Sequence, residues 1–477
     1  MFDKRKFYIN GEWVDPITPR DLQVINPATE QPIAVISMGS AADIDRAVSA
    51  AKRAFASYSR TSLDERIALL EKLRAIYERR YDEMARTITL ELGAPITMST
   101  EQQAHVGIGH LDGFIDALKA IKMREVLTNG DIVLREPIGV CGLITPWNWP
   151  INQIALKVIP ALATGSTCVL KPSEFTPLNA MLYAEMIAEA DFPAGSFNLV
   201  NGDGLEVGAA LSKHCDVDMM SFTGSTRAGT AVSKDAADTV KRVALELGGK
   251  SPNIVFEDAD LEERITGSVL ECFNNSGQSC DAPTRLLVQR TVYAQALDIA
   301  ERVGREARVG NPEEAGDHIG PLVSDIQHGR VQALIEAGIA DGARLLVGGP
   351  GKPHGFETGY FVKPTIFADV DNTMRIAREE VFGPVLAILP FDTEEEAIEI
   401  ANDTNYGLAA YVQSGDLDRA ERVATRLRAG MVHINGAPHR YGSPFGGYKQ
   451  SGIGREGGKF GLDDFLEIKT IHRPLIA

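Results

Sequence analysis

The chain has 477 residues, which is more than one hydrophobic core usually supports, so we expect two or three structural units. Its composition, with 44% hydrophobic and 24% charged residues and no apolar run long enough to span a bilayer, is that of a globular protein without a membrane partner. The net charge of −17 argues against nucleic-acid binding, and five scattered cysteines without CxxC spacing argue against a disulfide framework or a metal site.

The N-terminal residues 1–7 are charged and lead directly into strand-like residues, so they lack the apolar core of a signal peptide. We therefore expect a cytoplasmic protein. Residues 7–14 predict a β-hairpin, because the Asn-Gly pair at their centre accepts the positive φ angles of a tight turn. Two helices follow, one beginning after Ser40 and a longer one that begins after Ser62 and ends at Gly93.

From about residue 132, short β-rich runs alternate with helical ones. The first series of predicted strands comprises 132–134, 140–144, 167–170, 197–200, 219–222 and 243–247. The second series comprises 254–256, 286–288, 364–367, 385–389 and 431–434. This alternation predicts two α/β units, each with parallel strands and crossover helices on both faces of its sheet. A last strand at 465–471 has no partner nearby in sequence, so we expect it to pair with another element or subunit.

The segment Phe273–Arg285, FNNSGQSCDAPTR, carries a candidate nucleophile, Cys280. The small polar residues before this cysteine let the backbone approach a bound carbonyl group, and Pro283 ends the local helix or turn. The segment alone is also compatible with a buried, inert free cysteine, because cysteine is among the most buried residue types.

Two polar motifs directly follow predicted strands of the first series. In Thr145–Pro150, TPWNWP, prolines and tryptophans hold Asn148 at a strand end, where ligands bind in open α/β sheets. Capping of the next helix by Asn148 is the alternative. Lys171 and Glu174, in KPSE, have the chemistry to hydrogen-bond ribose hydroxyls, but a surface ion pair would have the same sequence.

Three further motifs combine glycine with polar or aromatic residues. Phe222–Gly229 reads as a strand, a turn and a helix start, a possible pyrophosphate seat although its spacing is not GxGxxG. Glu246 ends an apolar strand, where burial would raise its pKa into the range of a general base. The alternative is a structural ion pair between Glu246 and Lys250. Glu379–Val385 places a carboxylate and an aromatic ring before a strand, where they either bind a sugar and a heterocycle or anchor a loop.

In this order and across essentially the whole chain, these motifs resemble the aldehyde dehydrogenase superfamily. The matching stretches are PWNWP at Pro146, KPSE at Lys171, FTGST at Phe222, LELGGKSPNIVF at Leu245, GQSC at Gly277, EEVFGPV at Glu379 and PFGGYKQSGIGRE at Pro444. The resemblance implies an α/β fold with two doubly wound domains and a small β oligomerisation element. The implied boundaries are 1–122 and 146–248 for the NAD-binding domain, 249–442 for the catalytic domain, and 123–145 and 458–477 for the oligomerisation element.

The same resemblance implies the catalytic roles. Cys280 would attack the aldehyde, and Asn148 would hold the resulting oxyanion together with the backbone N–H of Cys280. Hydride transfer to NAD would leave a thioester, which a water activated by Glu246 would hydrolyse to a carboxylic acid. Lys157 and Glu456 match family positions thought to assist proton movement.

The cofactor contacts are also implied by the resemblance. The residues are Ile144, Thr145, Pro146, Trp147, Lys171, Glu174, Gly204, Gly208, Phe222, Gly224, Ser225, Leu247, Glu380 and Phe382. Glu380 falls at the nicotinamide ribose and Phe382 against the nicotinamide ring. A carboxylate at Glu174 accepts both ribose hydroxyls and repels a 2′-phosphate, so NAD is expected in preference to NADP, although NADP use remains open.

Substrate contacts are less clearly defined by the sequence. The family's aldehyde tunnel corresponds to Trp149, Asn152, Gln153, Leu156, Ser279, Asp281, His439, Arg440, Tyr441 and Phe445. The amides at Asn152 and Gln153 make the entrance polar. Arg440 would bind an acidic group on a semialdehyde, and the alternative is a surface arginine in a loop.

Two kinds of alternative remain open from the sequence. The first is a coenzyme A-acylating or NADP-preferring enzyme, although Glu246 favours water as the acceptor because a general base is then required. The second is a non-catalytic binding homologue, which would not need to keep Cys280, Glu246 and Asn148. The expected partners are a small aldehyde and further copies of the chain in a homodimer or homotetramer.

Overall fold

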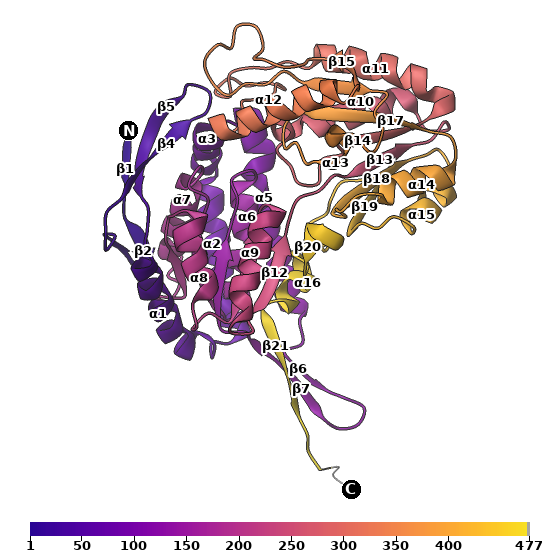
Figure 1. Cartoon of the computed structure of the whole chain (residues 1–477). Helices are drawn as coiled ribbons and strands as arrows, with labels where there is room; N and C mark the ends of the chain where they lie inside the picture. Colours follow the sequence, from indigo (N-terminus) through magenta and orange to yellow (C-terminus); the bar gives the residue numbers. More distant parts are fainter. Residues whose placement is uncertain (475–477) are drawn as a thin grey trace.

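The computed structural model describes residues 1–474, which form two α/β units and a projecting arm (Figure 1). Residues 475–477, the end of the predicted oligomerisation element, lie outside the described residues. Within residues 1–474, no helix combines the length and the apolar character that a membrane crossing requires.

The first unit is built on an eight-stranded sheet. In spatial order its strands are β20 (Gly452–Ile453), β12 (Arg242–Glu246), β11 (Met219–Thr223), β8 (Val140–Ile144), β9 (Thr167–Lys171), β10 (Phe197–Leu199), β2 (Phe7–Ile9) and β3 (Glu12–Val14). The run from β12 to β10 is parallel, and its three middle strands are buried at every residue, because helices cover both faces. The predicted hairpin is confirmed as β2–β3, with positive φ at Asn10 and Gly11.

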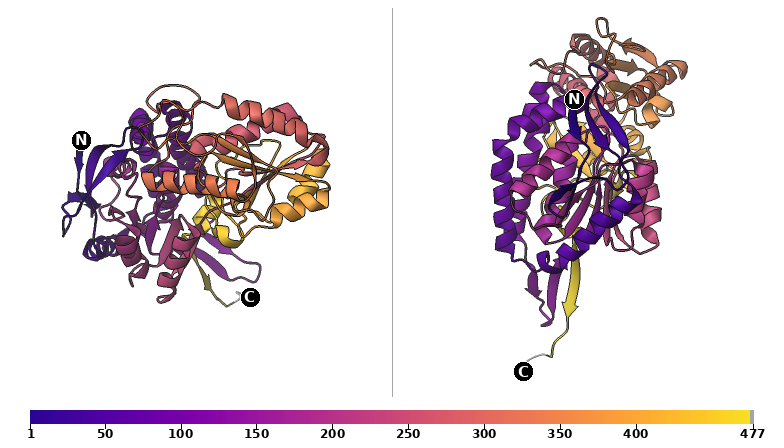
Figure 2. Two further views of the ribbon diagram at one scale, coloured as in Figure 1. Left: turned by 45° about the horizontal axis from the view of Figure 1, so that its top comes forward. Right: turned by 90° about the vertical axis from the view of Figure 1, so that its left-hand side faces the viewer.

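Alternate residues of β8 show the two covered faces. Cys141 and Leu143 belong to the core beneath one group of helices, whereas Val140 and Ile144 belong to the core beneath another. The first group is α2 (Leu63–Arg79), α3 (Tyr81–Leu92), α5 (His105–Ala120), α6 (Pro150–Thr164) and α7 (Leu178–Glu189). The second is α1 (Ala41–Tyr58), α8 (Ala209–Lys213) and α9 (Thr226–Ala237). Figure 2 shows these helices from two further sides.

The capping boxes at Ser40 and Ser62 are confirmed, but the single long helix predicted after Ser62 is wrong. The chain leaves helical geometry at Arg80, with φ −101° and ψ 17°, so α2 and α3 are separate helices. The second of them ends at Gly93 in the left-handed conformation that glycine accepts most readily.

The second unit contains a seven-stranded sheet. Its order is β15 (Arg344–Val347), β16 (Thr365–Ala368), β17 (Val385–Phe391), β14 (Arg285–Gln289), β13 (Pro252–Val255), β18 (Ala409–Gln413) and β19 (Met431–Ile434). One face is covered by α10 (Leu261–Phe273) and α11 (Tyr293–Glu306), and the other by α12 (Asp325–Ala340), α13 (Arg375–Arg378), α14 (Glu394–Asn402) and α15 (Leu417–Ala424). The predicted second α/β unit is therefore confirmed, with β15 and β18 as strands that the sequence reading missed.

Three strands form the arm, which extends away from the first unit: β6 (Arg124–Val126), β7 (Ile132–Pro137) and β21 (Leu466–Ile471). The predicted terminal strand pairs along its length with β7 of the same chain. The predicted boundary at residue 145 is too late, because 140–144 is a buried strand in the middle of the first sheet. A separate three-stranded sheet contains β1 (Phe2–Lys4), β5 (Gln31–Ser37) and β4 (Asp21–Asn26).

Short helical segments complete the chain. They are α4 (Ile96–Met98), the π-helices η1 (Ser99–Gln103) and η2 (Gly204–Gly208), the 3₁₀ turns η3 (Asn274–Gly277), η4 (Arg290–Val292) and η5 (Lys449–Ser451), and α16 (Gly458–Asp463). Two of these, η1 and η3, lie beside the candidate site.

Candidate active site

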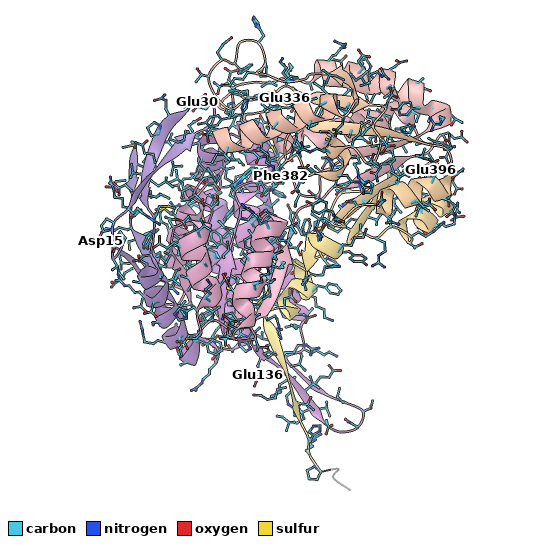
Figure 3. The ribbon with its side chains drawn as sticks, in the orientation of Figure 1. Asp15, Glu30, Glu136, Glu336, Phe382 and Glu396 are labelled. Carbon is cyan, nitrogen blue, oxygen red and sulfur yellow. The ribbon has the colours of Figure 1, made fainter. Side chains whose placement is uncertain are left out.

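The carboxyl ends of β8, β11 and β12 face the second unit across a cavity of about 150 Å³, which we call the interdomain cavity. Both units contribute to its wall: Pro146, Trp147, Asn148, Thr223, Gly224, Ser225, Glu246, Leu247, Gly248, Cys280, Gln327, Arg330, Glu380 and Phe382. Figure 3 labels Phe382 where the two units meet. The structure thus brings together the predicted nucleophile, oxyanion donor, general base and nicotinamide contacts.

Cys280 reaches the cavity through an unusual turn. Asn275, Ser276 and Gly277 all have positive φ, at 51°, 58° and 71°, a conformation that is uncommon outside glycine. A side chain at Gly277 would overlap the carbonyl group of Gly383, so the nucleophile loop and the loop that carries Phe382 are in direct contact. Such strained turns persist where the surrounding structure holds them, commonly at functional sites.

The thiol of Cys280 is half-buried, unlike Cys141, Cys168 and Cys272, which are buried. Burial raises the pKa of Cys280 well above its usual value, and the nearby carboxylates of Asp281, Glu380 and Glu246 add to the effect. The neutral thiol is therefore the resting form at neutral pH, and attack on a carbonyl carbon requires a base that removes its proton.

Asn148 lies in the connection between β8 and α6. Its Nδ2 donates a hydrogen bond to the carbonyl oxygen of Gln278 at 2.9 Å, and the second N–H of this amide is left for another acceptor. Helix α6 is preceded by Trp149 at its N-cap, so the alternative that Asn148 caps this helix is wrong. The indole Nε1 of Trp149 instead donates to Ser279 Oγ at 2.8 Å, a second link to the nucleophile loop.

Glu246 is the last residue of β12 and is buried, with an Oε2 atom that has no hydrogen-bond partner among the described residues. Burial raises its pKa well above the usual value, and the negative charge of Glu456 adds to the effect. No ion pair between Glu246 and Lys250 exists within residues 1–474. The buried ion pair in this region joins Glu456 to Lys157 of α6.

Glu380 and Phe382 occupy the opposite wall. Glu380 Oε1 accepts a hydrogen bond from the backbone N–H of Gly249 at 3.0 Å, and burial raises the pKa of this carboxyl group to about 7. A Cβ atom at Gly248 would overlap the same carboxylate, so the glycine allows its close approach. Phe382 has a φ of 57° and packs edge-on against Trp147, with ring centroids 5.3 Å apart.

Most of the other predicted cofactor contacts lie outside the wall of the interdomain cavity. Lys171 and Glu174 form an ion pair of 3.4 Å at the end of β9. Gly204 and Gly208 bound the π-helix η2, which begins beyond the neighbouring strand β10. Ile144, Thr145 and Phe222 belong to strand ends of the same sheet edge. Ser225 lines the cavity and accepts a hydrogen bond from Ala228 as the N-cap of α9.

The predicted substrate residues do not all lie around one cavity. Asp281 lines a separate cavity of about 450 Å³, which we call the substrate-side cavity, together with Glu271, Tyr411, His433 and His439. Cys280 and Phe445 pack on the same small apolar cluster, which includes Tyr411. Gln153 is buried, and its Oε1 lacks a partner within the described chain.

Arg440 lies in the exposed segment 436–443 and lines neither cavity. Its guanidinium group makes no ion pair or hydrogen bond with any residue in 1–474. Sequence reading missed Gln327 and Arg330 of α12, which line the interdomain cavity. Gln327 Nε2 donates to the carbonyl groups of Val381 and Phe382, but neither residue belongs to a motif that would have identified it.

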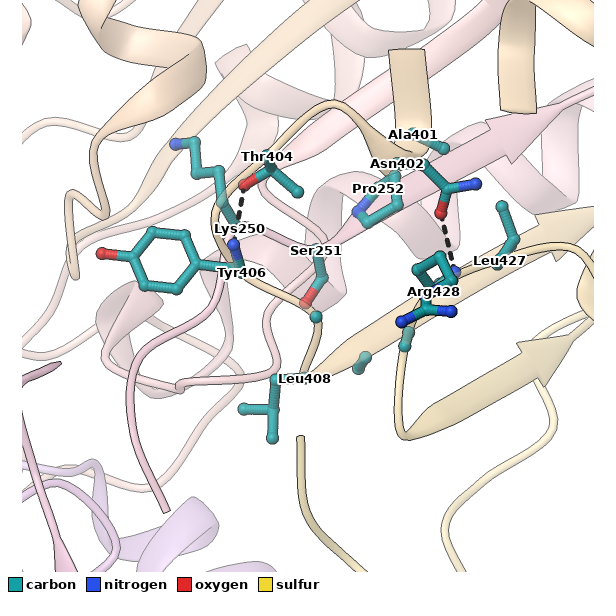
Figure 4. A pocket seen from close by; sticks show the side chains of 14 residues that line it. Lys250, Ser251, Pro252, Ala401, Asn402, Thr404, Tyr406, Leu408, Leu427 and Arg428 are labelled. Carbon is teal, nitrogen blue, oxygen red and sulfur yellow. Dashed lines mark hydrogen bonds between the residues drawn. The ribbon is translucent and has the colours of Figure 1, made fainter. Parts of the chain in front are cut away.

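A small cavity of about 10 Å³ beside Lys250, shown in Figure 4, has room for no more than about one water molecule. Burial lowers the pKa of this lysine to about 8, and its amine points away from Ser251 in this view. The cavity contains none of the predicted site residues. Within the described chain, one group of side chains has metal-ligand spacing, His214 to Asp216, and Asp216 is already paired with Lys52.

Comparison with known proteins gives consistent results. A protein-family model described as "Aldehyde dehydrogenase family" matches residues 13–471 of this chain. The 3-succinoylsemialdehyde-pyridine dehydrogenase of Pseudomonas sp is 53% identical over 472 residues, 99% of each chain. A solved aldehyde dehydrogenase from Bartonella henselae is 53% identical with a TM-score of 0.98, over 99% of each chain. A cysteine-to-alanine mutant of aldehyde dehydrogenase C from Pseudomonas syringae, solved with NAD+ and octanal, is 49% identical with a TM-score of 0.97, over 98% of this chain and 96% of that one. These scores confirm the predicted fold class.

Proposed function

Because the chain belongs to the aldehyde dehydrogenase family, we propose that it oxidises an aldehyde to a carboxylic acid with NAD as the hydride acceptor. It is an oxidoreductase that acts on aldehydes, and a relative of 49% identity was solved with NAD+ bound. One observation carries the mechanism: Cys280, Asn148 and Glu246 line a single cavity between the two units.

The interdomain cavity fits the nicotinamide half of NAD. Phe382 offers an aromatic face, Glu380 offers a carboxylate that accepts ribose hydroxyls, and the buried Thr223 Oγ1 on the same wall has no partner among the described residues. When bound there, NAD accepts the hydride that leaves the carbon attached to Cys280. The chain's residues position the reacting carbon and control the protons.

In the first half of the reaction, Glu246 is the base for the Cys280 thiol, because both side chains line the interdomain cavity. Proton transfer to this carboxylate frees the thiolate, whose Sγ forms a bond to the carbonyl carbon while the carbonyl oxygen gains the negative charge. The unused N–H of Asn148 and the backbone N–H of Cys280 stabilise that oxyanion in a site with little water.

In the second half, Glu246 removes a proton from the water that attacks the thioester, the carbon–sulfur bond breaks, and the acid leaves. The buried ion pair of Lys157 and Glu456 affects the pKa of Glu246: the charge of Lys157 lowers this pKa, and the charge of Glu456 raises it. We propose that this pair accepts the proton from Glu246, which is the role that the family resemblance implied for Lys157 and Glu456.

For the substrate, we propose an uncharged aldehyde rather than an acidic semialdehyde. The 53% identical relative is named 3-succinoylsemialdehyde-pyridine dehydrogenase, and the 49% identical one was solved with octanal. The carboxylate of Asp281 directly follows the nucleophile and would repel a second carboxylate, whereas Arg440 is exposed. The acidic substrate predicted from Arg440 remains the competing hypothesis.

NAD preference rests on Glu174, whose carboxylate would repel the 2′-phosphate of NADP. We also propose that the arm mediates a homodimer or homotetramer, because Ile468 and Ile471 of β21 expose apolar side chains. No feature of the described residues favours coenzyme A over water, and the cytoplasmic location stays a prediction.

The test is NADH formation by the purified protein with NAD and a panel of aliphatic, aromatic and acidic aldehydes, with Cys280→Ala in parallel. We expect NADH from the wild type and none from the variant. If turnover required NADP or coenzyme A, the cofactor or acceptor assignment would be wrong. If neither restored it, the protein would be a non-catalytic member of the family.

A further inference from the structure

The oxyanion donor and the nucleophile loop are joined by a closed ring of amide hydrogen bonds. Asn148 Nδ2 donates to the carbonyl oxygen of Gln278 at 2.9 Å. Asn275 Nδ2 donates to the same carbonyl at 3.3 Å and to the carbonyl oxygen of Asn148 at 2.8 Å. The ring therefore ties the side chain of Asn148 to its own backbone and to a residue two positions before Cys280. All three members are buried.

Gln103 extends this ring into the helical layer of the first unit. Its Nε2 donates to the carbonyl oxygen of Asn148 at 3.1 Å and to Asn275 Oδ1 at 3.3 Å. The side chain is fully buried and comes from the C-terminal end of η1, immediately before α5. A π-helix contains one more residue per turn than an α-helix, and such insertions are frequent at functional sites because they redirect side chains.

Burial of the Gln103 amide costs free energy unless its donor hydrogen bonds are made. Its Oε1 is buried and has no partner among the described residues, so the amide is held here by its donor side alone. Its two acceptors are the groups that orient Asn148 and the left-handed turn at Asn275. Loss of the donor would leave Asn275 Oδ1 without a partner and would free one end of a strained turn.

We propose that Gln103 is a positioning residue, which sets the direction of the Asn148 amide relative to Cys280 although it contacts neither substrate nor cofactor. The inference rests on the proposed role of Asn148 as oxyanion donor. Gln103 acts through two hydrogen bonds, one to the backbone of Asn148 and one to the turn that presents the nucleophile. A misplacement of about 1 Å at such a donor is enough to slow a reaction about 100-fold.

The test is a double-mutant cycle with Gln103→Met, which keeps the length of the side chain and removes its donor. With a short neutral aldehyde, we expect kcat to fall at least about tenfold in Gln103→Met, while the KM for NAD stays within about twofold of wild type. Asn148→Ala alone is expected to lower kcat about 100-fold. In the Asn148→Ala background, Gln103→Met should change kcat by less than about twofold, because the amide side chain whose direction Gln103 is proposed to set is already gone.

Asn179→Leu is the matched control. Asn179 is also a buried amide whose Nδ2 donates two hydrogen bonds, to Glu91 and to the carbonyl oxygen of Thr176, and whose Oδ1 has no partner in the described chain. It lies on α7, lines neither cavity and bonds neither Asn148 nor the nucleophile loop. We expect its kcat to stay within about twofold of wild type at a similar loss of thermal stability.

The outcomes separate the two claims. If Asn148→Ala kept full activity, the proposed oxyanion donor would be wrong. If Asn148→Ala lost activity but Gln103→Met lowered kcat by the same factor in both backgrounds, or no more than Asn179→Leu does, the positioning role would be refuted. Gln103→Asn, which shortens the side chain by one methylene, replaces the methionine variant in the cycle if the latter does not fold, with the same expectations.

Discussion

The two sides of Cys280 are built differently. On the cofactor side, the interdomain cavity is fixed by backbone contacts: Gly277 against Gly383, and Gly248 and Gly249 against the Glu380 carboxylate. On the substrate side, the wall includes the carboxylate of Asp281 and residues 436–439 of the exposed segment 436–443. A surface set by close backbone approach tolerates few changes, whereas one made of side chains on a loop can vary. We therefore expect substitutions on the first side to abolish steps of the reaction and those on the second to change selectivity.

The largest effect is expected for Glu246→Gln on the cofactor side. Because Glu246 is the base for both the Cys280 thiol and the attacking water, the variant should lose the NADH burst, and steady turnover should fall by about 10²–10⁴. Rapid mixing with absorbance detection measures both phases. A variant that kept a burst of one NADH per site and lost only the steady rate would show that Glu246 acts on water alone and that another group deprotonates Cys280.

The raised pKa of Glu246 predicts how thioester hydrolysis depends on pH. Its pKa is raised above the usual value near 4.5, so at lower pH the folded protein holds it protonated and inactive as a base. The hydrolysis rate should therefore rise with pH through this raised pKa and level off above it. Single-turnover decay of the thioester in the wild type should show this rise. A decay rate that did not change with pH would mean that another group activates the water.

A pair of glycine substitutions compares the two sides directly. A Cβ at Gly248 would overlap the Glu380 carboxylate, so Gly248→Ala should displace it and raise the KM for NAD about tenfold or more. Gly267 lines the substrate-side cavity within α10, and a Cβ there would meet no atom within 4 Å. Gly267→Ala should leave the KM for NAD unchanged and stabilise the helix by about 0.5–1 kcal/mol. Equal effects of the two variants on the KM for NAD would show that the two sides of Cys280 do not differ in this way.

The same difference explains what the sequence could predict. Cys280, Asn148, Glu246 and Phe382 lie in contiguous motifs at strand or loop ends, where local residue types determine the backbone, and all four line the interdomain cavity. The position of Arg440 depends on an exposed loop, for which local sequence gives no direction. A sequence motif predicts where two backbone segments can come close together. It predicts much less about side chains from distant segments that meet across a cavity.

Residues that join distant elements were also beyond the sequence. Gln103 meets Asn148 and Asn275 only because η1, the end of β8 and the nucleophile loop come together in three dimensions. The break at Arg80 and the placement of 140–144 in the first sheet likewise depend on packing, because the local patterns fit a longer helix and a longer arm.

A smaller effect, confined to selectivity, is expected for Asp281→Asn. Removal of the carboxylate beside the nucleophile should raise kcat/KM for an acidic semialdehyde about tenfold and leave a neutral aldehyde of the same length within about twofold. The ratio of the two kcat/KM values is the measurement, with Asp281→Glu as the control that keeps the charge. If both substrates changed equally, the charge of Asp281 would not contribute to selectivity.

The smallest effect is expected for Arg440→Ala. The side chain is exposed and unpaired within the described chain, and it lines neither cavity, so kcat/KM for acidic and neutral aldehydes should change by less than about twofold. Lys459, another exposed cation on the first unit, gives a matched Lys459→Ala control. A loss of tenfold or more for the acidic semialdehyde alone would reverse the substrate proposal, because it would mean that the segment 436–443 closes over the substrate and brings the guanidinium group to its carboxylate. In that event the substrate side would owe its selectivity to a moving loop, and Asp281→Asn and Arg440→Ala should then change the preference for the acidic substrate in opposite directions.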